Sequence, residues 1–242
     1  MEGIVSLLDV KHYHLVEDLW AELAREFGVR GVYITPYPHF SYHVAAHYDI
    51  ESLTPIIDRI TSNITTFQVR TSGLGIFTGE APIIYIPVVR SLELTQLHEA
   101  LWEEISPTAS GAQEYYHPTQ WMPHITIGFG DINKGNLPPI VRWLNGRDFN
   151  WEITVNNITF IQDTGTEQVL KARFEIRNEP VPGESSMKRL HRRRLTHETL
   201  QGILEVREQI RQHTNGCVFE DSSELIRQQR EERTRQLMRE EE

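Results

Sequence analysis

The sequence has little cysteine, fewer basic than acidic residues (24 against 34) and no long apolar run. Its one cysteine, Cys217, excludes an internal disulfide framework, which favours a reducing compartment such as the cytoplasm. The formal net charge of -10 argues against a track of many phosphate contacts with duplex DNA or RNA, but leaves a nucleotide or an RNA terminus open as a ligand. No run reaches the length of a membrane span, and no basic segment typical of a signal peptide precedes the short apolar stretch after Met1. We therefore expect a soluble, cytoplasmic protein that binds no membrane.

The chain of 242 residues, 39% of them hydrophobic, has enough apolar material for one sizeable domain or two small ones. Apolar residues recur at helical spacing in residues 16–28 and 94–105, and the first of these helices is expected to end at Gly28. Seven other segments have the alternation or the β-branched content of strands, namely 31–37, 39–45, 65–77, 81–89, 124–129, 149–162 and 168–177. Helices and strands are therefore interleaved.

The two halves of the chain repeat the same order of features. Each half reads as Pro-His, a short strand, an acidic turn at Asp49 or Asp131, a helix, and a long strand that starts at Phe67 or Trp151. Chance easily produces two Pro-His pairs, but not two pairs followed by the same elements at nearly equal distances. Residues 1–178 are therefore predicted to contain two copies of one unit, neither of which need be stable alone.

The repeats open with "HFSY" and "HITI", in which a histidine and a hydroxyl residue are two positions apart. Side chains of an extended strand alternate between its faces, so His39 and Ser41 are expected on one face and His124 and Thr126 on the equivalent face. The aliphatic and aromatic residues between them would pack on a helix. We expect the two polar faces to line a groove between the halves.

Two such faces suit displacement at phosphorus. The attacking and leaving oxygens lie roughly in line, so a base is needed on one side and an acid on the other. Imidazole supplies either role near neutral pH, and hydroxyl groups donate to the non-bridging oxygens. This chemistry requires no metal.

Both motifs resemble the paired His-x-Ser/Thr-x motifs of the 2H phosphoesterase superfamily, and their framing is similar to its 2'-5' RNA ligase-like and cyclic phosphodiesterase branch. The resemblance covers residues 1–178. It implies a bilobal, duplicated α+β fold with pseudo-twofold symmetry, in which two antiparallel sheets face a central cleft and the helices lie outside. It also implies hydrolysis or reversible ligation of 2',3'-cyclic phosphates or 2'-5' linkages in nucleotides or RNA termini, without a metal or cofactor. By this resemblance His39 and His124 would be the acid and base, while Ser41 and Thr126 would bind the phosphate.

Two positions leave alternatives open. "GFGD" follows the second motif where some relatives carry a basic residue, so the phosphate charge is balanced by Arg70 or not at all. His43 shares the expected face of His39 and Ser41, but the hydroxyl position that would accompany it is Ala45, which cannot donate a hydrogen bond. We therefore assign catalysis to His39 and expect His43 to line the cleft.

Aromatic residues near the motifs allow two interpretations. Tyr37 and Tyr115 either line the cleft, where an aromatic ring stacks on a nucleobase, or pack as structural residues. Zinc is a further alternative for a chain with eleven histidines, but helical ligand spacings are absent and His39 with His43 is half a site, so we predict no metal. Two other functions also remain: a module that binds nucleotides or RNA ends without turnover, and a structural subunit of a protein complex.

The composition changes after Arg177. Residues 179–186 are predicted to be a linker that contains proline, glycine and serine, and residues 187–242 a helical C-terminal extension that begins with a basic run. The extension has too few apolar residues to build a core. It is therefore a solvated helical tail or a surface that binds the catalytic lobes, a second copy of the chain or another protein.

Overall fold

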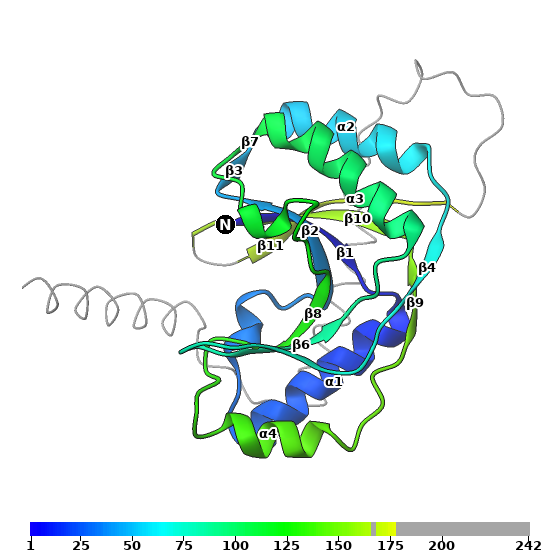
Figure 1. Cartoon of the computed structure of the whole chain (residues 1–242). Helices are drawn as coiled ribbons and strands as arrows, with labels where there is room; N and C mark the ends of the chain where they lie inside the picture. Colours follow the sequence, from blue (N-terminus) through cyan, green and yellow to red (C-terminus); the bar gives the residue numbers. More distant parts are fainter. Residues whose placement is uncertain (166–167, 178–242) are drawn as a thin grey trace, which may run out of the picture. The chain divides into compact units, whose positions relative to one another are not determined.

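The computed structural model describes residues 1–165 and 168–177, in which helices pack against antiparallel sheets (Figure 1). The first lobe has a sheet of four strands in the order β11 (Gln168–Glu175), β10 (Asn157–Asp163), β1 (Glu2–Leu7) and β2 (His39–Ala45). Helices α2 (Ile50–Ser62) and α3 (Leu92–Ile105) cover this sheet. The mixture of helices with antiparallel sheets in two lobes agrees with the predicted fold class.

The second lobe has a smaller sheet in the order β5 (Gly75–Phe77), β6 (Ile83–Pro87) and β8 (His124–Gly128). Helix α1 (Val10–Phe27) packs on β8, and α4 (Leu137–Leu144) lies beside α1. The rings of Phe27 and Trp143 hold these two helices together, and Arg147 just beyond α4 pairs with Glu22 of α1.

Four short strands form two pairs outside these sheets. Strand β3 (His47–Tyr48) pairs with β7 (Ala109–Ser110), and β4 (Phe67–Arg70) pairs with β9 (Glu152–Val155). Short 3₁₀ helices occupy Gly31–Ile34 (η1), Ser106–Thr108 (η2) and Glu114–Tyr116 (η3).

The two lobes exchange helices. Helix α1 lies between β1 and β2 in the sequence but packs on β8 of the other lobe, while α3 lies between β6 and β8 but packs on β2. Strands β4 and β9 occupy equivalent places in the repeats and pair with each other. Each sheet also combines strands from both halves of the chain, so neither half can form and cover a sheet alone.

The registers of the two sheets repeat. Leu7 lies opposite His39 in the first sheet, and Pro87 lies opposite His124 in the second. Both pairs of strands also contain a β-bulge, which shifts the register just before Val5 in β1 and just before Tyr85 in β6. The structural equivalence is therefore closest around the two motifs.

The structure departs from the sequence prediction in four places. The strand predicted at residues 149–162 is two strands, β9 and β10, which separate at residue 156 and pair with different partners. The strand predicted at residues 31–37 is wrong, because residues 31–34 form the 3₁₀ helix η1. The strand predicted at 65–77 is two strands separated by a turn at Gly73, whose positive φ of 67° suits glycine. Strand β1 was not predicted, although it lies inside the first sheet beside the motif strand.

Asp131 explains why residues 31–34 are not a strand. Its Oδ2 atom accepts hydrogen bonds from the backbone N–H groups of Arg30 (2.5 Å) and Gly31 (3.0 Å) at the N-terminus of η1. Asp49 has a different role, because it caps the N-terminus of α2 by accepting from the amide of Glu51. The two acidic turns of the repeats are therefore not structurally equivalent.

Gly31 is expected to tolerate no side chain. A Cβ at this position would lie 1.8 Å from the carbonyl oxygen of Phe129, which belongs to the backbone and has little freedom to move. Gly31→Ala should lower the free energy of unfolding by about 2–3 kcal/mol, measured by urea denaturation. Gly146→Ala is the control, since nothing lies within 4 Å of a Cβ there, and it should change stability by less than about 0.5 kcal/mol. Equal effects of the two substitutions would contradict the close approach at Gly31.

The linker predicted at residues 179–186 and the extension predicted at 187–242 lie outside the described residues. Among the helices that the structure describes, none combines the length and the apolar character needed to cross a bilayer.

Candidate active site

The two motifs lie on β2 and β8, strands of different lobes that contact each other. In each motif the apolar residues are buried, with Phe40 and Tyr42 at most 1% exposed and Ile125 and Ile127 fully buried. The histidine and hydroxyl residues alternate with them and are only partly buried. The predicted alternation therefore holds through both four-residue motifs.

The two histidines are held by the same contact. His39 Nδ1 lies 2.5 Å from the carbonyl oxygen of Tyr37, and His124 Nδ1 lies 2.6 Å from that of Met122. A carbonyl only accepts, so each Nδ1 carries the hydrogen and donates it. In a neutral imidazole the proton-accepting lone pair is then on Nε2. Both side chains therefore present the same nitrogen for proton transfer.

Two tryptophans fix the backbone of the motifs, each from the other repeat. Trp121, in the loop before β8, donates from its indole nitrogen to the carbonyl oxygen of Ser41 (2.9 Å). Trp20, in α1, donates likewise to the carbonyl oxygen of Thr126 (3.1 Å). Each motif is thus positioned by the half of the chain that carries the other motif. Neither role can be predicted from the sequence, because each bond joins residues that are far apart along the chain.

Burial lowers the pKa of both motif histidines below the ordinary value of 6.5. For His39, burial outweighs the bond to the Tyr37 carbonyl, which raises the pKa, and the charge of a protonated His124 lowers it further. For His124, burial again outweighs the bond to the Met122 carbonyl. The interaction between the two imidazoles means that protonation of one disfavours protonation of the other.

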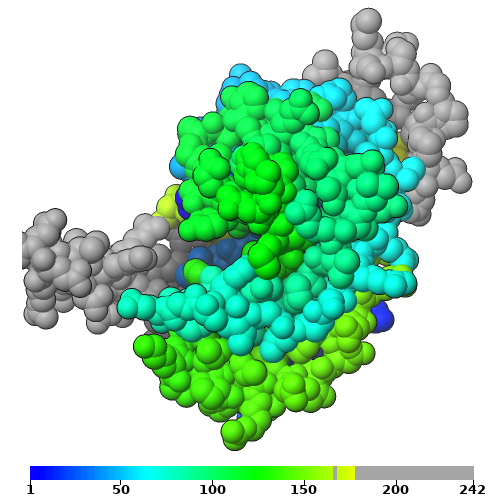
Figure 2. Space-filling view, in the orientation of Figure 1, coloured from blue at the N-terminus to red at the C-terminus, as the bar shows by residue number. Residues whose placement is uncertain are grey.

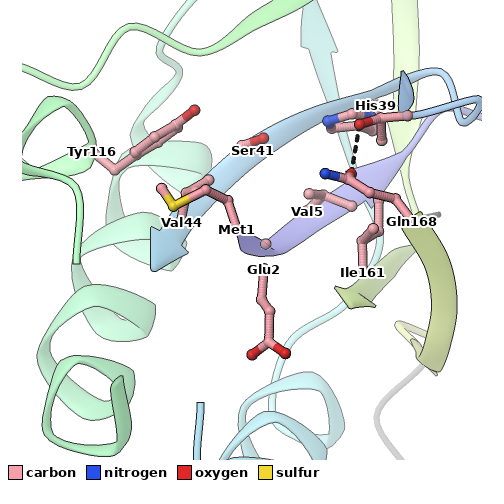
Figure 3. Close-up of a pocket in the computed structure, with 11 residues that line it drawn as sticks. Met1, Glu2, Val5, His39, Ser41, Val44, Tyr116, Ile161 and Gln168 are labelled. Carbon is pink, nitrogen blue, oxygen red and sulfur yellow. Dashed lines mark hydrogen bonds between the residues drawn. The ribbon is translucent and has the colours of Figure 1, made fainter. Parts of the chain in front are cut away.

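A pocket opens beside the first motif (Figures 2 and 3). In Figure 2 the surface is hollowed between the green and the teal segments, and dark blue atoms of the N-terminal strands lie at its bottom. Its polar lining includes His39, Ser41 and the hydrogen-bonded pair Thr35 and Gln168. Tyr116 of η3 closes one side.

Two aromatic rings contact the histidine of the second motif. The ring of His124 makes T-shaped contacts with the rings of Phe77 and Tyr85, at centroid distances of 5.0 and 5.1 Å. The rings of Phe77 and Tyr85 stack on each other at a centroid distance of 4.2 Å. A Cβ at Gly75 would lie 2.4 Å from the Tyr85 ring, so glycine is required for the ring to lie against this strand. The aromatic pair fixes the plane of the His124 imidazole.

His43 is not in the cleft, and its predicted position there is wrong. The bulge in β2 makes Ile4 pair with His43 directly after Val5 pairs with Ser41, so the strict alternation ends after the motif. His43 is fully buried, bonds to the hydroxyl of Tyr48 (2.6 Å) and faces α3. Burial lowers its pKa to about 4. Val44 lines the pocket instead.

Three other candidates do not contribute their side chains to the pocket lining. Arg70 is 79% exposed on β4 and faces Glu152, its partner across the strand pair, at 3.7 Å. Tyr115 is 78% exposed, and its neighbour Tyr116 lines the pocket. Tyr37 packs its ring beside the first sheet, against an apolar cluster that includes Leu7, and serves the site through its carbonyl. The aromatic segment before the second motif thus reaches the pocket, but through a different tyrosine.

Within residues 1–165 and 168–177, no group of three or more histidine, cysteine, aspartate or glutamate side chains is arranged to hold a metal ion.

Comparison with known proteins identifies the fold and the family. A model of the 2'-5' RNA ligase superfamily matches residues 11–167. Among solved structures the chain is similar to TT0787 of Thermus thermophilus, with a TM-score of 0.52 and 14% identity over 74% of this chain and 98% of that one. It is also similar to Escherichia coli LigT in its apo form, with a TM-score of 0.49 and 17% identity over 73% of this chain and 96% of that one. No curated protein matches the sequence.

Proposed function

We propose that this chain, which belongs to the 2'-5' RNA ligase superfamily, is a metal-independent phosphodiesterase of nucleotides or RNA termini. Its substrates would carry a 2',3'-cyclic phosphate or a 2'-5' linkage. The observation that carries the proposal is the matched pair of imidazoles on β2 and β8. Each donates from Nδ1 to a carbonyl two residues earlier and leaves Nε2 for the reaction.

In the proposed hydrolysis, one neutral imidazole takes a proton from water through Nε2. The water oxygen forms a bond to phosphorus as the bond between phosphorus and one ribose oxygen breaks. The other histidine, protonated, donates its Nε2 proton to the leaving ribose oxygen. The products are a phosphomonoester and a free ribose hydroxyl. Ligation would use the same two histidines with a ribose 5'-hydroxyl in place of water: its oxygen bonds to the phosphorus of the cyclic phosphate as the bond to the 3' oxygen breaks and that oxygen is protonated. The reverse of this step cleaves a 2'-5' linkage and re-forms the cyclic phosphate at the same site.

The hydroxyl groups of Ser41 and Thr126 would hold the non-bridging oxygens of the phosphate. Ser41 lines the pocket with His39, and Thr126 is partly buried two residues after His124 on the equivalent strand. Hydroxyl donors aimed at the position where negative charge develops stabilise the transition state more than the ground state. No lysine or arginine among the described residues belongs to the lining of this pocket, so the proposed phosphate contacts are with neutral hydroxyl groups and the histidines.

The direct test is turnover in the presence of EDTA. The purified protein is incubated with the four nucleoside 2',3'-cyclic monophosphates and with 2'-5' and 3'-5' dinucleotides, beside the double variant His39→Ala/His124→Ala. We expect the unaltered protein alone to cleave a substrate, at a rate that the chelator does not change. Loss of the activity in EDTA would contradict the metal-independent mechanism.

A second candidate is a module that binds a nucleotide or an RNA end without turnover. The absence of a lysine or arginine from the pocket lining, in the part of the chain that the structure describes, favours it, because many phosphodiesterases balance the phosphate charge with such a cation. A stable complex from which the ligand is recovered unchanged would support this function over catalysis.

Residues 187–242 are proposed to bind a second copy of the chain or another protein in the cytoplasm. Their composition, with few apolar and many charged residues, carries this proposal. Deletion of residues 183–242 should change the molar mass measured by light scattering, or abolish co-purification of a partner. An unchanged mass and unchanged partners would remove the proposal.

A further inference from the structure

The two lobes leave unequal space beside their histidines. Val5 in the first lobe and Tyr85 in the second occupy equivalent positions, since they lie opposite Ser41 and Thr126 respectively. The Tyr85 ring packs against His124, whereas the smaller Val5 lines the pocket. The space for a substrate group attached to the phosphate therefore lies beside His39, in the first lobe.

The size of the pocket suits a single ring. Its volume is about 170 Å³, and a protein cavity of about 150 Å³ accommodates benzene. Val5 and Ile161 provide apolar surface on one side of the pocket, and Val44 and Tyr116 stand on the other side in Figure 3. A flat ring with one polar edge fits these surroundings.

The polar group facing that ring is the side-chain amide of Gln168. The hydroxyl of Thr35 donates a hydrogen bond of 2.5 Å to Oε1 of Gln168. This bond uses the acceptor atom of the amide and leaves its nitrogen as the donor. In Figure 3 the amide nitrogen of Gln168 lies on the side of the pocket that leads to Ser41 and Tyr116. Thr35 follows η1 and Gln168 begins β11, so two distant segments fix the orientation of this amide. The pocket therefore offers a hydrogen-bond donor.

We propose that the pocket binds the pyrimidine base of a nucleotide whose phosphate lies between the two histidines. Gln168 Nε2 donates to the carbonyl oxygen at C2, which uracil and cytosine share. A purine is excluded in part by its second ring. Thr35 is a positioning residue, because its bond to Oε1 keeps the donor end of the amide toward the base. This assignment rests on the proposed function and adds the substrate class to it.

The test measures binding rather than turnover. Cytidine and adenosine 2'-monophosphate contain no diester to cleave, and their affinities for the full chain are measured by calorimetry. The unaltered protein should bind the cytidine nucleotide about tenfold more tightly. Gln168→Met keeps the length of the side chain but removes its donors, and should weaken cytidine binding about five- to tenfold while leaving adenosine binding unchanged.

Thr35 supplies a matched pair of variants. Thr35→Val keeps the shape and removes the hydroxyl, so the amide is free to turn its carbonyl inward and the preference for cytidine should fall about fivefold. Thr35→Ser retains the hydroxyl and should keep the preference. If Thr35→Val binds cytidine over adenosine nucleotide as strongly as the unaltered protein does, the positioning role of Thr35 is wrong. Circular dichroism verifies that each variant is folded.

The outcomes separate this proposal from the proposed function. Equal affinity for the two nucleotides, no binding of either, or an equal loss for both in Gln168→Met would overturn the pyrimidine pocket even if the enzyme is active. Binding that prefers cytidine in a protein without turnover would leave the pocket in place and remove only the enzymatic function.

Discussion

Replacing either His39 or His124 with alanine is expected to reduce kcat by about 10²- to 10⁴-fold, the range that a positioned acid or base contributes. Each imidazole presents Nε2 for proton transfer, so removal of either ring leaves one half of the reaction without its catalyst. The two groups act in one step, so the kcat of the double variant should be only slightly lower than that of the less active single variant. Single-turnover measurements with the best cyclic nucleotide give the rates directly.

The fold of these variants should be intact. Both rings are only partly buried and bond to the protein through a local carbonyl, so their removal costs far less packing than the loss of a core residue. His14→Ala is the matched control, because His14 is more than half exposed on α1, where its partner is Glu17. The control should retain full activity. Full activity in either His39→Ala or His124→Ala would remove the two-histidine mechanism.

The motifs could be located from the sequence because they depend on local geometry. Alternation along a strand needs no tertiary information, and it holds from His39 to Tyr42 and from His124 to Ile127. The same rule failed one residue later at His43, where a bulge reverses the faces. Bulges depend on the pairing of two strands, and the partner strand β1 was itself missed. A single sequence contains no direct signal for such a register shift.

The rest of the site depends on which segments the fold brings together. Gln168 lies far from the first motif in sequence, and reaches the pocket because β11 and β10 extend the sheet that contains β1 and β2. The order of elements predicted two repeats but not the exchange of α1 and α3 between lobes. A helix shows the same hydrophobic periodicity whichever of the two sheets it covers. The periodicity therefore cannot predict that α1 and α3 cover the sheets of opposite lobes.

The pH dependence of catalysis follows from the lowered pKa values of both histidines. The reactive form of the free enzyme has one neutral and one protonated imidazole. Burial places the pKa of His39 and that of His124 below 6.5. Below both pKa values the two rings are protonated and the base is lost. Above both values the two rings are neutral and the acid is lost, so the concentration of the reactive form falls as the pH rises.

We therefore expect kcat/KM to be bell-shaped, with its maximum below about pH 6.5 and a fall approaching tenfold per pH unit on the alkaline side. Initial rates between about pH 4 and about pH 9, under conditions where the protein stays folded, give this profile. Bis(nitrophenyl) phosphate offers a chemical control, because its leaving phenolate departs without a proton. Its alkaline limb should flatten, since only the neutral base is then required. A kcat/KM for a cyclic nucleotide that rises steadily through neutral pH would mean that neither imidazole donates the proton, and the acid would have to be sought elsewhere in the cleft.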